Sequence, residues 1–180
     1  GFEIYSQGDK TDHLALWDHL MASGEPHGME FSATSSMTMR RIEAGILGNG
    51  SDIDPSMTPF EAGLGWVVDL AKDDFVGRAA LLDADQRPLL YGLTCAAALP
   101  AVGSTILDGD KPVGRMTMGV RSPTLDCGIG YVLFDEPGDW PGRTLQIRLP
   151  SGESHPCEIV ELPFFDPEKQ IARGLDRSIP

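Results

Sequence analysis

From Arg87 onward the chain is a succession of short β-type runs separated by turn residues, and this pattern constrains the fold most strongly. Strands are expected over residues 89–94, 104–107, 111–120, 130–134, 144–149 and 157–161. Turn pairs such as Asp108-Gly109, Pro137-Gly138 and Ser151-Gly152 lie between them. Short strands at this spacing, with tight connections, favour a small antiparallel barrel or sandwich.

The residues before Arg87 carry helical patterns instead, which makes the chain α+β with a boundary near residues 84–87. A first helix is expected from Thr11 to Met21, with Thr11 or Asp12 as its N-cap. Its apolar residues recur at i, i+3 and i+7 and form one face, made of Leu14, Trp17 and Met21. A second helix is expected over residues 34–43, and Gly45 offers its C-terminal stop.

Thr58-Pro59-Phe60-Glu61 has the form of a helix start. Threonine caps, proline suits the first helical position, and glutamate completes a capping box. The segment leads into residues 64–70, which can be interpreted as helix or as strand. Trp66 in this segment is interpreted as a core residue rather than as a stacking platform. Another short helix is expected over residues 74–82.

The charge of the chain narrows the classes of partner. A net charge of −13 opposes binding to nucleic acid and to anionic membrane. No apolar run approaches the ~20 residues of a membrane-spanning helix. The odd number of cysteines, at positions 95, 127 and 157, argues against a disulfide framework and favours buried thiols in a cytoplasmic protein.

Pattern alone identifies no catalytic or metal-binding residue. Asp52 and Asp54 lie in a turn-rich loop and lack the remaining ligands of a calcium loop, so they are interpreted as turn and cap residues. The four histidines have no partners at metal-ligand spacing. Glu3 leaves two interpretations open. It is a solvent-facing strand residue, or a carboxylate that accepts two parallel N–H bonds from a heterocycle.

Several stretches, in order along the chain, resemble the glycine cleavage T-protein family. They are Gly1-Phe2-Glu3-Ile4, Arg41-Ile42-Glu43-Ala44-Gly45, Gly48-Asn49-Gly50-Ser51-Asp52-Ile53-Asp54, Thr58-Pro59-Phe60-Glu61-Ala62-Gly63-Leu64-Gly65-Trp66, Asp74-Phe75-Val76-Gly77-Arg78, Gly114-Arg115-Met116-Thr117-Met118-Gly119, Ser122-Pro123-Thr124-Leu125, Ile129-Gly130-Tyr131-Val132 and Leu162-Pro163-Phe164-Phe165.

The resemblance implies the second part of a folate-binding α/β domain, followed by a small antiparallel C-terminal β-barrel. In these terms residues 1–57 are a partial folate-binding domain and residues 58–86 are connecting helices. Residues 87–165 are the barrel, and residues 166–180 form a tail. The implied cofactor is tetrahydrofolate. The family's catalytic acid falls in a part that this sequence does not contain, so no catalytic residue is assigned.

The resemblance carries over two ligand-binding positions. Glu3 matches the glutamate that binds the pterin ring. Aminomethyltransferases usually carry an arginine four positions before the Arg-x-Glu-Ala-Gly run, and here that position is Met37. Methionine supplies neither the charge nor the bidentate fork of arginine. Arg41 and Glu43 also match family positions and are interpreted as structural.

The function implied is tetrahydrofolate-dependent transfer of an aminomethyl or methyl group. The donor is an aminomethyl-lipoyl carrier protein or a small methylated compound, namely a sulfonium, an amine or an aryl ether. The alternative is a non-catalytic folate-binding or interaction protein. Gly1-Phe2 reads as the middle of a strand, so the sequence is expected to be a fragment, inactive alone. We therefore expect a homo-oligomer through Phe2–Tyr5 and the face of Leu14, Trp17 and Met21.

Overall fold

The computed structural model describes residues 3–8 and 10–177. The chain divides into two compact units, Gly1–Ser36 and Met37–Pro180. Within the described ranges, no helix combines the length and apolar character that crossing a membrane requires.

The main element of the first unit is helix α1 (His13–Gly24), which follows an extended segment and makes an edge-to-face ring contact from Trp17 to Phe31. The helix begins where the Asp12 carboxylate accepts a 3.0 Å hydrogen bond from the Ala15 amide, so the expected cap is confirmed. None of the residues of α1 is buried. A 3-10 turn, η1 (Glu25–His27), follows it. The Gly1-Phe2 part of the expected strand lies outside the described residues.

Helix α2 (Thr34–Glu43) spans the boundary between the units and ends as expected at Gly45. Gly45 adopts a left-handed conformation with φ of 68°. The Ile46 amide donates to the Arg41 carbonyl at 2.9 Å, and the Gly45 amide donates to the Ile42 carbonyl at 3.0 Å. This pair of bonds is the Schellman motif, which satisfies carbonyls that a helix end leaves free.

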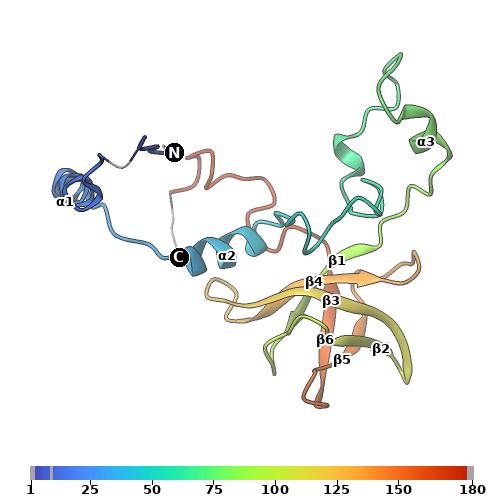
Figure 1. Cartoon of the computed structure of the whole chain (residues 1–180). Coiled ribbons are helices and arrows are strands. Elements are labelled where there is room, and N and C mark those ends of the chain that lie inside the picture. Colours follow the sequence, from blue (N-terminus) through green and yellow to red (C-terminus); the bar gives the residue numbers. More distant parts are fainter. Residues whose placement is uncertain (1–2, 9, 178–180) are drawn as a thin grey trace. The chain divides into compact units, whose positions relative to one another are not determined.

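The second unit is dominated by a closed antiparallel barrel (Figure 1). Its strands are β1 (Leu90–Cys95), β2 (Thr105–Asp108), β3 (Lys111–Ser122), β4 (Cys127–Phe134), β5 (Thr144–Arg148) and β6 (Ser154–Val160). They neighbour one another in the order β1-β4-β3-β2-β5-β6, and β6 pairs back onto β1. The α+β fold with a small antiparallel C-terminal barrel is therefore confirmed, and the sandwich alternative is not adopted.

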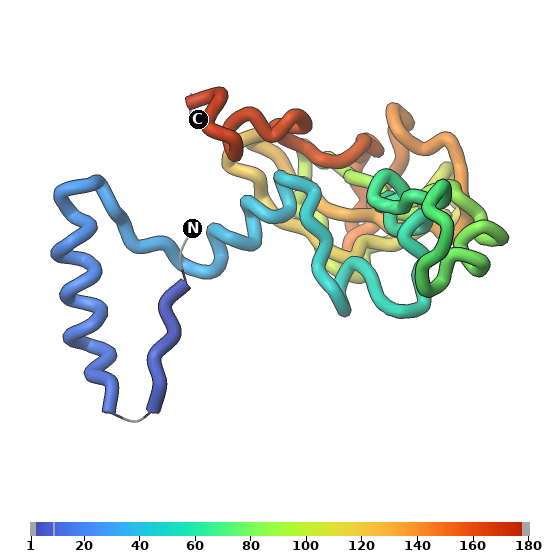
Figure 2. Tube along the Cα trace, turned by 90° about the horizontal axis from the view of Figure 1, so that it is seen from above, coloured from blue at the N-terminus to red at the C-terminus, as the bar shows by residue number. Residues whose placement is uncertain are grey.

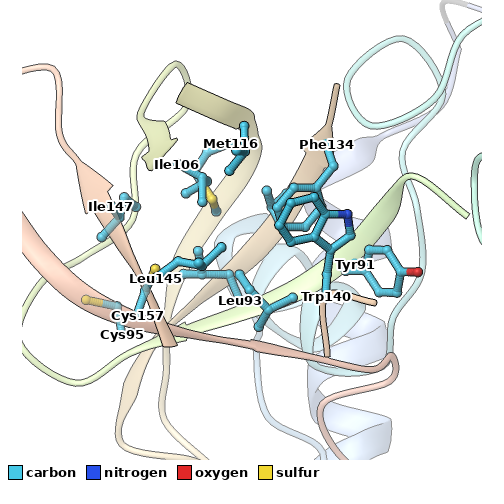
Figure 3. Packing of buried hydrophobic residues seen from close by; sticks show 13 residues of the cluster. Tyr91, Leu93, Cys95, Ile106, Met116, Phe134, Trp140, Leu145, Ile147 and Cys157 are labelled. Carbon is cyan, nitrogen blue, oxygen red and sulfur yellow. The ribbon is translucent and has the colours of Figure 1, made fainter. Parts of the chain in front are cut away.

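Two hydrophobic clusters use the two faces of the barrel wall. The interior cluster contains Leu93, Ile106, Met116, Phe134 and Ile147, all at 1% exposure or less (Figure 3). Residues on the outer face of β4 are buried as well, because Ile129 and Tyr131 pack against Ile42 at the end of α2. Strand β4 is therefore covered on both sides, and α2 is anchored to the barrel.

The segment between α2 and the barrel forms turns rather than the expected helix from Thr58. The capping box does form: the Thr58 amide donates to Glu61 at 2.7 Å, and the Glu61 amide donates to the Thr58 hydroxyl at 3.2 Å. Only one helical turn follows, because Gly63 turns left-handed with φ of 71°. A 3-10 turn, η2 (Gly65–Val67), and a short helix, α3 (Arg78–Asp83), complete the connection.

Candidate functional site

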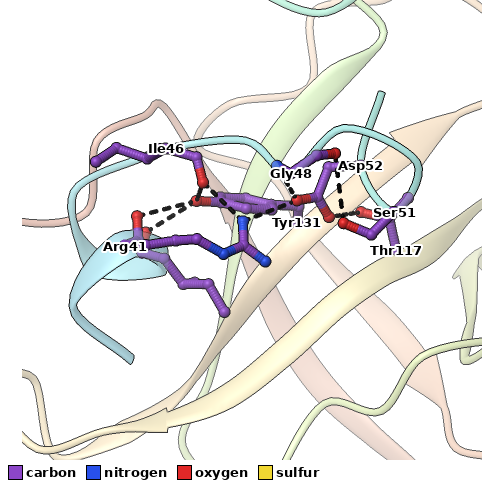
Figure 4. Close-up of polar contacts among 8 residues, drawn as sticks. Arg41, Ile46, Gly48, Ser51, Asp52, Thr117 and Tyr131 are labelled. Atoms are coloured by element: carbon purple, nitrogen blue, oxygen red, sulfur yellow. Dashed lines mark hydrogen bonds and ion pairs between the residues drawn. The ribbon is translucent and has the colours of Figure 1, made fainter. Parts of the chain in front are cut away.

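The end of α2 is clamped onto the barrel by the Tyr131 hydroxyl. That hydroxyl donates towards the carbonyls of Ile46, Ile42 and Arg41, at 3.1, 3.2 and 3.4 Å respectively (Figure 4). A single proton is shared among these acceptors, two of which are helix-end carbonyls. Burial raises the pKa of Tyr131, so the group stays a donor at neutral pH. The helix end is thus held at one place on the barrel wall.

A buried carboxylate, Asp52, extends this clamp into the following loop. It is 2% exposed and accepts from Arg41 at 2.9 Å, from the Gly48 amide at 2.7 Å and from the Thr117 hydroxyl at 2.9 Å. A β-bulge between Met116 and Met118 displaces Thr117 from the regular ladder with β4. The interpretation of Asp52 as a turn residue was incomplete, since its carboxylate joins α2, the loop and β3.

Glu43 forms a second buried carboxylate site on the other side of the same helix end. It accepts hydrogen bonds from the Ser122 hydroxyl, from the Thr124 amide at 3.3 Å and from the Thr124 hydroxyl at 3.1 Å. Glu43 is 7% exposed, so these donors replace the water that its charge would otherwise require. Arg41 and Glu43 therefore have the polar partners that a structural role requires.

A cavity of about 600 Å³ lies against this clamped region. Five separate segments line it, namely the residues just after α2, the loop at Ile53, the turns that lead into η2 together with η2 itself, the start of β1 and the segment after β6; their residues are Ala44, Gly45, Ile46, Leu47, Ile53, Ala62, Gly63, Leu64, Trp66, Pro88, Leu90, Tyr91, Glu161, Leu162, Pro163, Pro167 and Lys169. The segment after β6, red in Figure 2, reaches α2 through a 3.1 Å bond from the Phe165 amide to the Glu43 carbonyl. The volume is within the range of small-molecule sites.

Trp66 lines this cavity and is 76% exposed, so its interpretation as a core residue was wrong. The Lys169 ammonium lies 5.8 Å from the centroid of the Trp66 ring, within the range of a cation–π contact. The Asp166 carboxylate shapes this segment by accepting from the Gln170 amide at 2.6 Å and from the Ile171 amide at 3.0 Å. Asp166 and Lys169 both have positive φ, which bends the backbone sharply here.

The remaining polar groups of the cavity are Glu161 and Tyr91. Burial raises the pKa of Tyr91, and the negative charge of Glu161 raises it further. The phenol is therefore a neutral donor beside a carboxylate. The cavity combines an exposed aromatic face, a cation, a carboxylate and an apolar wall, which suits a flat ligand that carries both apolar and ionic parts.

The two ligand-binding positions carried over by resemblance lie in different units. Glu3 is exposed in the first unit and accepts a hydrogen bond from the Tyr5 hydroxyl, which raises the pKa of Tyr5. Met37 begins the second unit and is 68% exposed. Their roles in binding stay predictions. Sequence reasoning did not select Lys169, although the flanking Pro167 and Asp166 signalled a turn there.

Comparisons with known proteins agree with this architecture. Residues 1–72 match the family model of the GCVT N-terminal domain, and residues 89–166 match the glycine cleavage T-protein C-terminal barrel domain. A protein named aminomethyltransferase from Saccharopolyspora erythraea is 37% identical over 171 residues, which cover 92% of this chain and 46% of that protein. Another from Alkaliphilus oremlandii is 34% identical over 169 residues, covering 92% of this chain and 45% of that protein.

The structural comparison gives the same result. The crystal structure of glycine cleavage system aminomethyltransferase T from Bartonella henselae matches with a TM-score of 0.70 at 25% identity, over 86% of this chain and 44% of that one. The chain thus spans somewhat less than half the length of these relatives. Since both family models match in order and together cover most of its residues, the chain belongs to the glycine cleavage T-protein family.

Proposed function

We propose that this chain supplies part of a site that transfers an aminomethyl or methyl group to tetrahydrofolate. The observation that carries the proposal is the ordered match to both domains of the glycine cleavage T-protein family. The relatives named aminomethyltransferase support the reaction class. In such a transfer the folate contributes the nitrogen that accepts the carbon, and the protein contributes positioning and exclusion of water.

The residues of the larger cavity fit the chemistry of a folate. A folate combines flat conjugated rings with a carboxylate-bearing tail, so it needs an aromatic or apolar surface together with a cation. Trp66 offers an exposed ring face, and Lys169 places its ammonium close to that ring. Glu3 and Met37 do not line this cavity. The family resemblance alone assigns Glu3, in the first unit, as the carboxylate for the N–H groups of the pterin edge, and Met37 as an uncharged apolar contact.

Binding measurements on the complete protein test the role of the cavity. Lys169→Gln removes the cation and is expected to weaken tetrahydrofolate binding about tenfold, as is typical for loss of a charge-assisted contact. Trp66→Leu is expected to weaken it by a similar factor. Lys111→Gln, which changes an exposed lysine outside the cavity, is the matched control. If all three variants bind tetrahydrofolate as tightly as the unaltered protein, the cavity is not part of the folate site.

We also propose that the 180-residue chain alone is inactive, because its polar groups account for only part of a folate site. Calorimetric titration of this chain with tetrahydrofolate is expected to give binding weaker than micromolar. Micromolar binding would contradict this proposal and would show that the chain contains enough of the site to hold the ligand.

The carbon donor distinguishes two versions of the function. One donor is an aminomethyl group on a lipoyl carrier protein, and the other is a small sulfonium, amine or aryl-ether compound. The exposed, uncharged Met37 counts against the lipoyl-carrier donor, because aminomethyltransferases usually carry an arginine at this position, but it does not identify the small compound. Turnover of tetrahydrofolate by the complete protein, measured separately with each donor, decides between them. Activity with the lipoyl carrier alone would reject the small-compound version.

A non-catalytic folate-binding protein is the alternative, and it shares the cavity but not the turnover. Tight binding of tetrahydrofolate without consumption of any of these donors would establish it. Self-association through Tyr5 and the α1 face stays a prediction, supported by the 71% exposure of Leu14. Light scattering at several protein concentrations tests it, and a monomer throughout would reject it.

A further inference from the structure

A smaller cavity, of about 260 Å³, opens on another part of the barrel wall. The loop after Asp52 forms one side of it, and strand β3 with the turn at Val102 forms the other; the lining residues are Ser51, Asp52, Ile53, Asp54, Ser56, Met57, Val102, Gly103, Arg115, Met116, Thr117 and Leu133. Ile53 also lines the larger cavity, so the two cavities share one residue. The proposed transfer function does not use the smaller one.

Two opposite charges line this smaller cavity without pairing. Asp54 belongs to the loop and Arg115 to β3. Among residues 3–8 and 10–177, the exposed Arg115 side chain makes no hydrogen bond or ion pair, and its charge attracts Asp54 without direct contact. The hydrogen bonds from Ser56 lower the pKa of Asp54, and the charge of Arg115 adds to this effect. Asp54 is therefore ionised at neutral pH.

The groups around these charges are held in place. The Asp54 carboxylate accepts from the Ser56 amide at 2.7 Å and from the Ser56 hydroxyl at 2.5 Å, which fixes its orientation in an Asx turn. Asp52 has three donors of its own, so its charge is already compensated. Met57 and Met116 contribute flexible apolar surface that adapts to a small ligand.

We propose that this cavity binds a small zwitterion of the amino-acid type, with its ammonium group on Asp54 and its carboxylate on Arg115. A ligand with one charge is attracted by one side chain and repelled by the other, whereas a zwitterion satisfies both. The volume is just below that of drug-sized sites, which limits the cavity to small ligands, and a single amino acid fits within it. The site is independent of the one-carbon transfer proposed above.

Amide NMR spectra of the 180-residue chain, titrated with glycine, β-alanine and γ-aminobutyrate, test the proposal. Saturable shifts are expected in residues 51–57 and at Arg115 to Thr117. The amino acid that binds most tightly reports the separation of the two charges. Acetate and methylammonium, each with a single charge, are the comparison probes and are expected to bind about tenfold more weakly.

Variants that remove one charge at a time test whether Arg115 and Asp54 bind the ligand. Arg115→Gln and Asp54→Asn are each expected to weaken binding of the best amino acid about tenfold. Asp54→Asn keeps an oxygen for Ser56, so the loop keeps its shape. Arg148→Gln, an exposed arginine on β5, is the matched control. The proposal is overturned if no amino acid gives saturable shifts, or if acetate binds as tightly as the amino acids, which would make this a simple anion site.

Discussion

The barrel and helix α1 were both expected from the sequence, yet only the barrel encloses a core. Leu93 and Ile147 inside the barrel are completely buried, whereas Leu14 in α1 is 71% exposed. Both regions satisfy their backbone groups, the barrel through its ladders and α1 through its own hydrogen bonds and the Asp12 cap. The difference lies in burial of side chains.

The contrast shows the difference between stabilisation by local backbone hydrogen bonds, as in α1, and stabilisation by tertiary packing of side chains, as in the barrel. A capped helix of 12 residues is marginal in water unless its apolar face packs against something. A sheet that closes on itself buries one face of every strand without needing another element. The barrel should therefore dominate the free energy of unfolding of this chain, and α1 should contribute little to it.

A matched pair of leucine truncations tests the comparison most strongly. Leu93→Ala is expected to destabilise the chain by about 2–5 kcal/mol, because it opens a cavity in a fully buried site. Leu14→Ala is expected to stay within about 0.5 kcal/mol, because that side chain is already in water. Urea unfolding monitored by circular dichroism gives both values. Similar losses for the two variants would show that α1 has a packing partner in solution.

The two loop aspartates provide the next test, within the second unit. Asp52→Ala is expected to cost about 3 kcal/mol, at the lower end for a buried ion pair because Arg41 keeps part of its side chain in water. Asp54→Ala removes only contacts to Ser56 at the surface and is expected to cost under about 0.5 kcal/mol. Chemical denaturation measures both. A small cost at Asp52 would show that the network does not hold α2 to the barrel.

The dependence of stability on alkaline pH tests the burial of the Cys157 thiol inside the barrel. Burial raises the pKa of Cys157 from 9.0 to about 12. Below pH 9 the thiol is protonated in both states, so its contribution is constant. Between pH 9 and 12 only the unfolded state loses the proton, so the free energy of unfolding falls as pH rises, by at most about 1.4 kcal/mol per pH unit. Cys157→Ala should make this decline shallower.

Cys127→Ala is the control for the alkaline measurement, since Cys127 is only partly buried on the outer face of β4 and its pKa is raised less. Unfolding is followed from pH 8 to 11 in both variants. An identical decline in the two would mean that other groups, such as the tyrosines, account for the alkaline sensitivity.

The smallest expected effect is local to α1. Asp12→Ala removes the carboxylate that accepts from the Ala15 amide and is expected to cost the helix about 1 kcal/mol. Hydrogen exchange of the α1 amides should accelerate about fivefold, while the barrel amides stay unchanged. Slower exchange in both regions, or equal acceleration in both, would contradict the independence of the two units.

Local patterns in the sequence were sufficient to predict the barrel and the ends of α2. Short β-type runs and the turn pairs between them located the strands of the described barrel, although β4 begins at Cys127 and β6 at Ser154, earlier than expected. Pro156 obscured the start of β6, and it is tolerated because that part of β6 pairs with β5 but not with β1. The capping box at Thr58 predicted its hydrogen bonds correctly but not the length of the helix.

The cavities could not be predicted in the same way. Segments around residues 45, 65, 90 and 165 meet at the larger cavity, and no local pattern relates them. The exposure of Trp66 depends on where those segments leave space, so composition favoured burial and was misleading. Asp52 was missed for a similar reason, because its partner Thr117 is distant in sequence and is reached through a bulge.

The pairing of β1 with β6 brings the two points where the chain enters and leaves the barrel onto neighbouring strands. A module with adjacent entry and exit can be inserted into another polypeptide, or circularly permuted, without breaking its sheet. The barrel should therefore tolerate circular permutation. A version that joins β6 to β1 through a short linker and has its new termini at the Ser151-Gly152 turn should keep the same strand pairing.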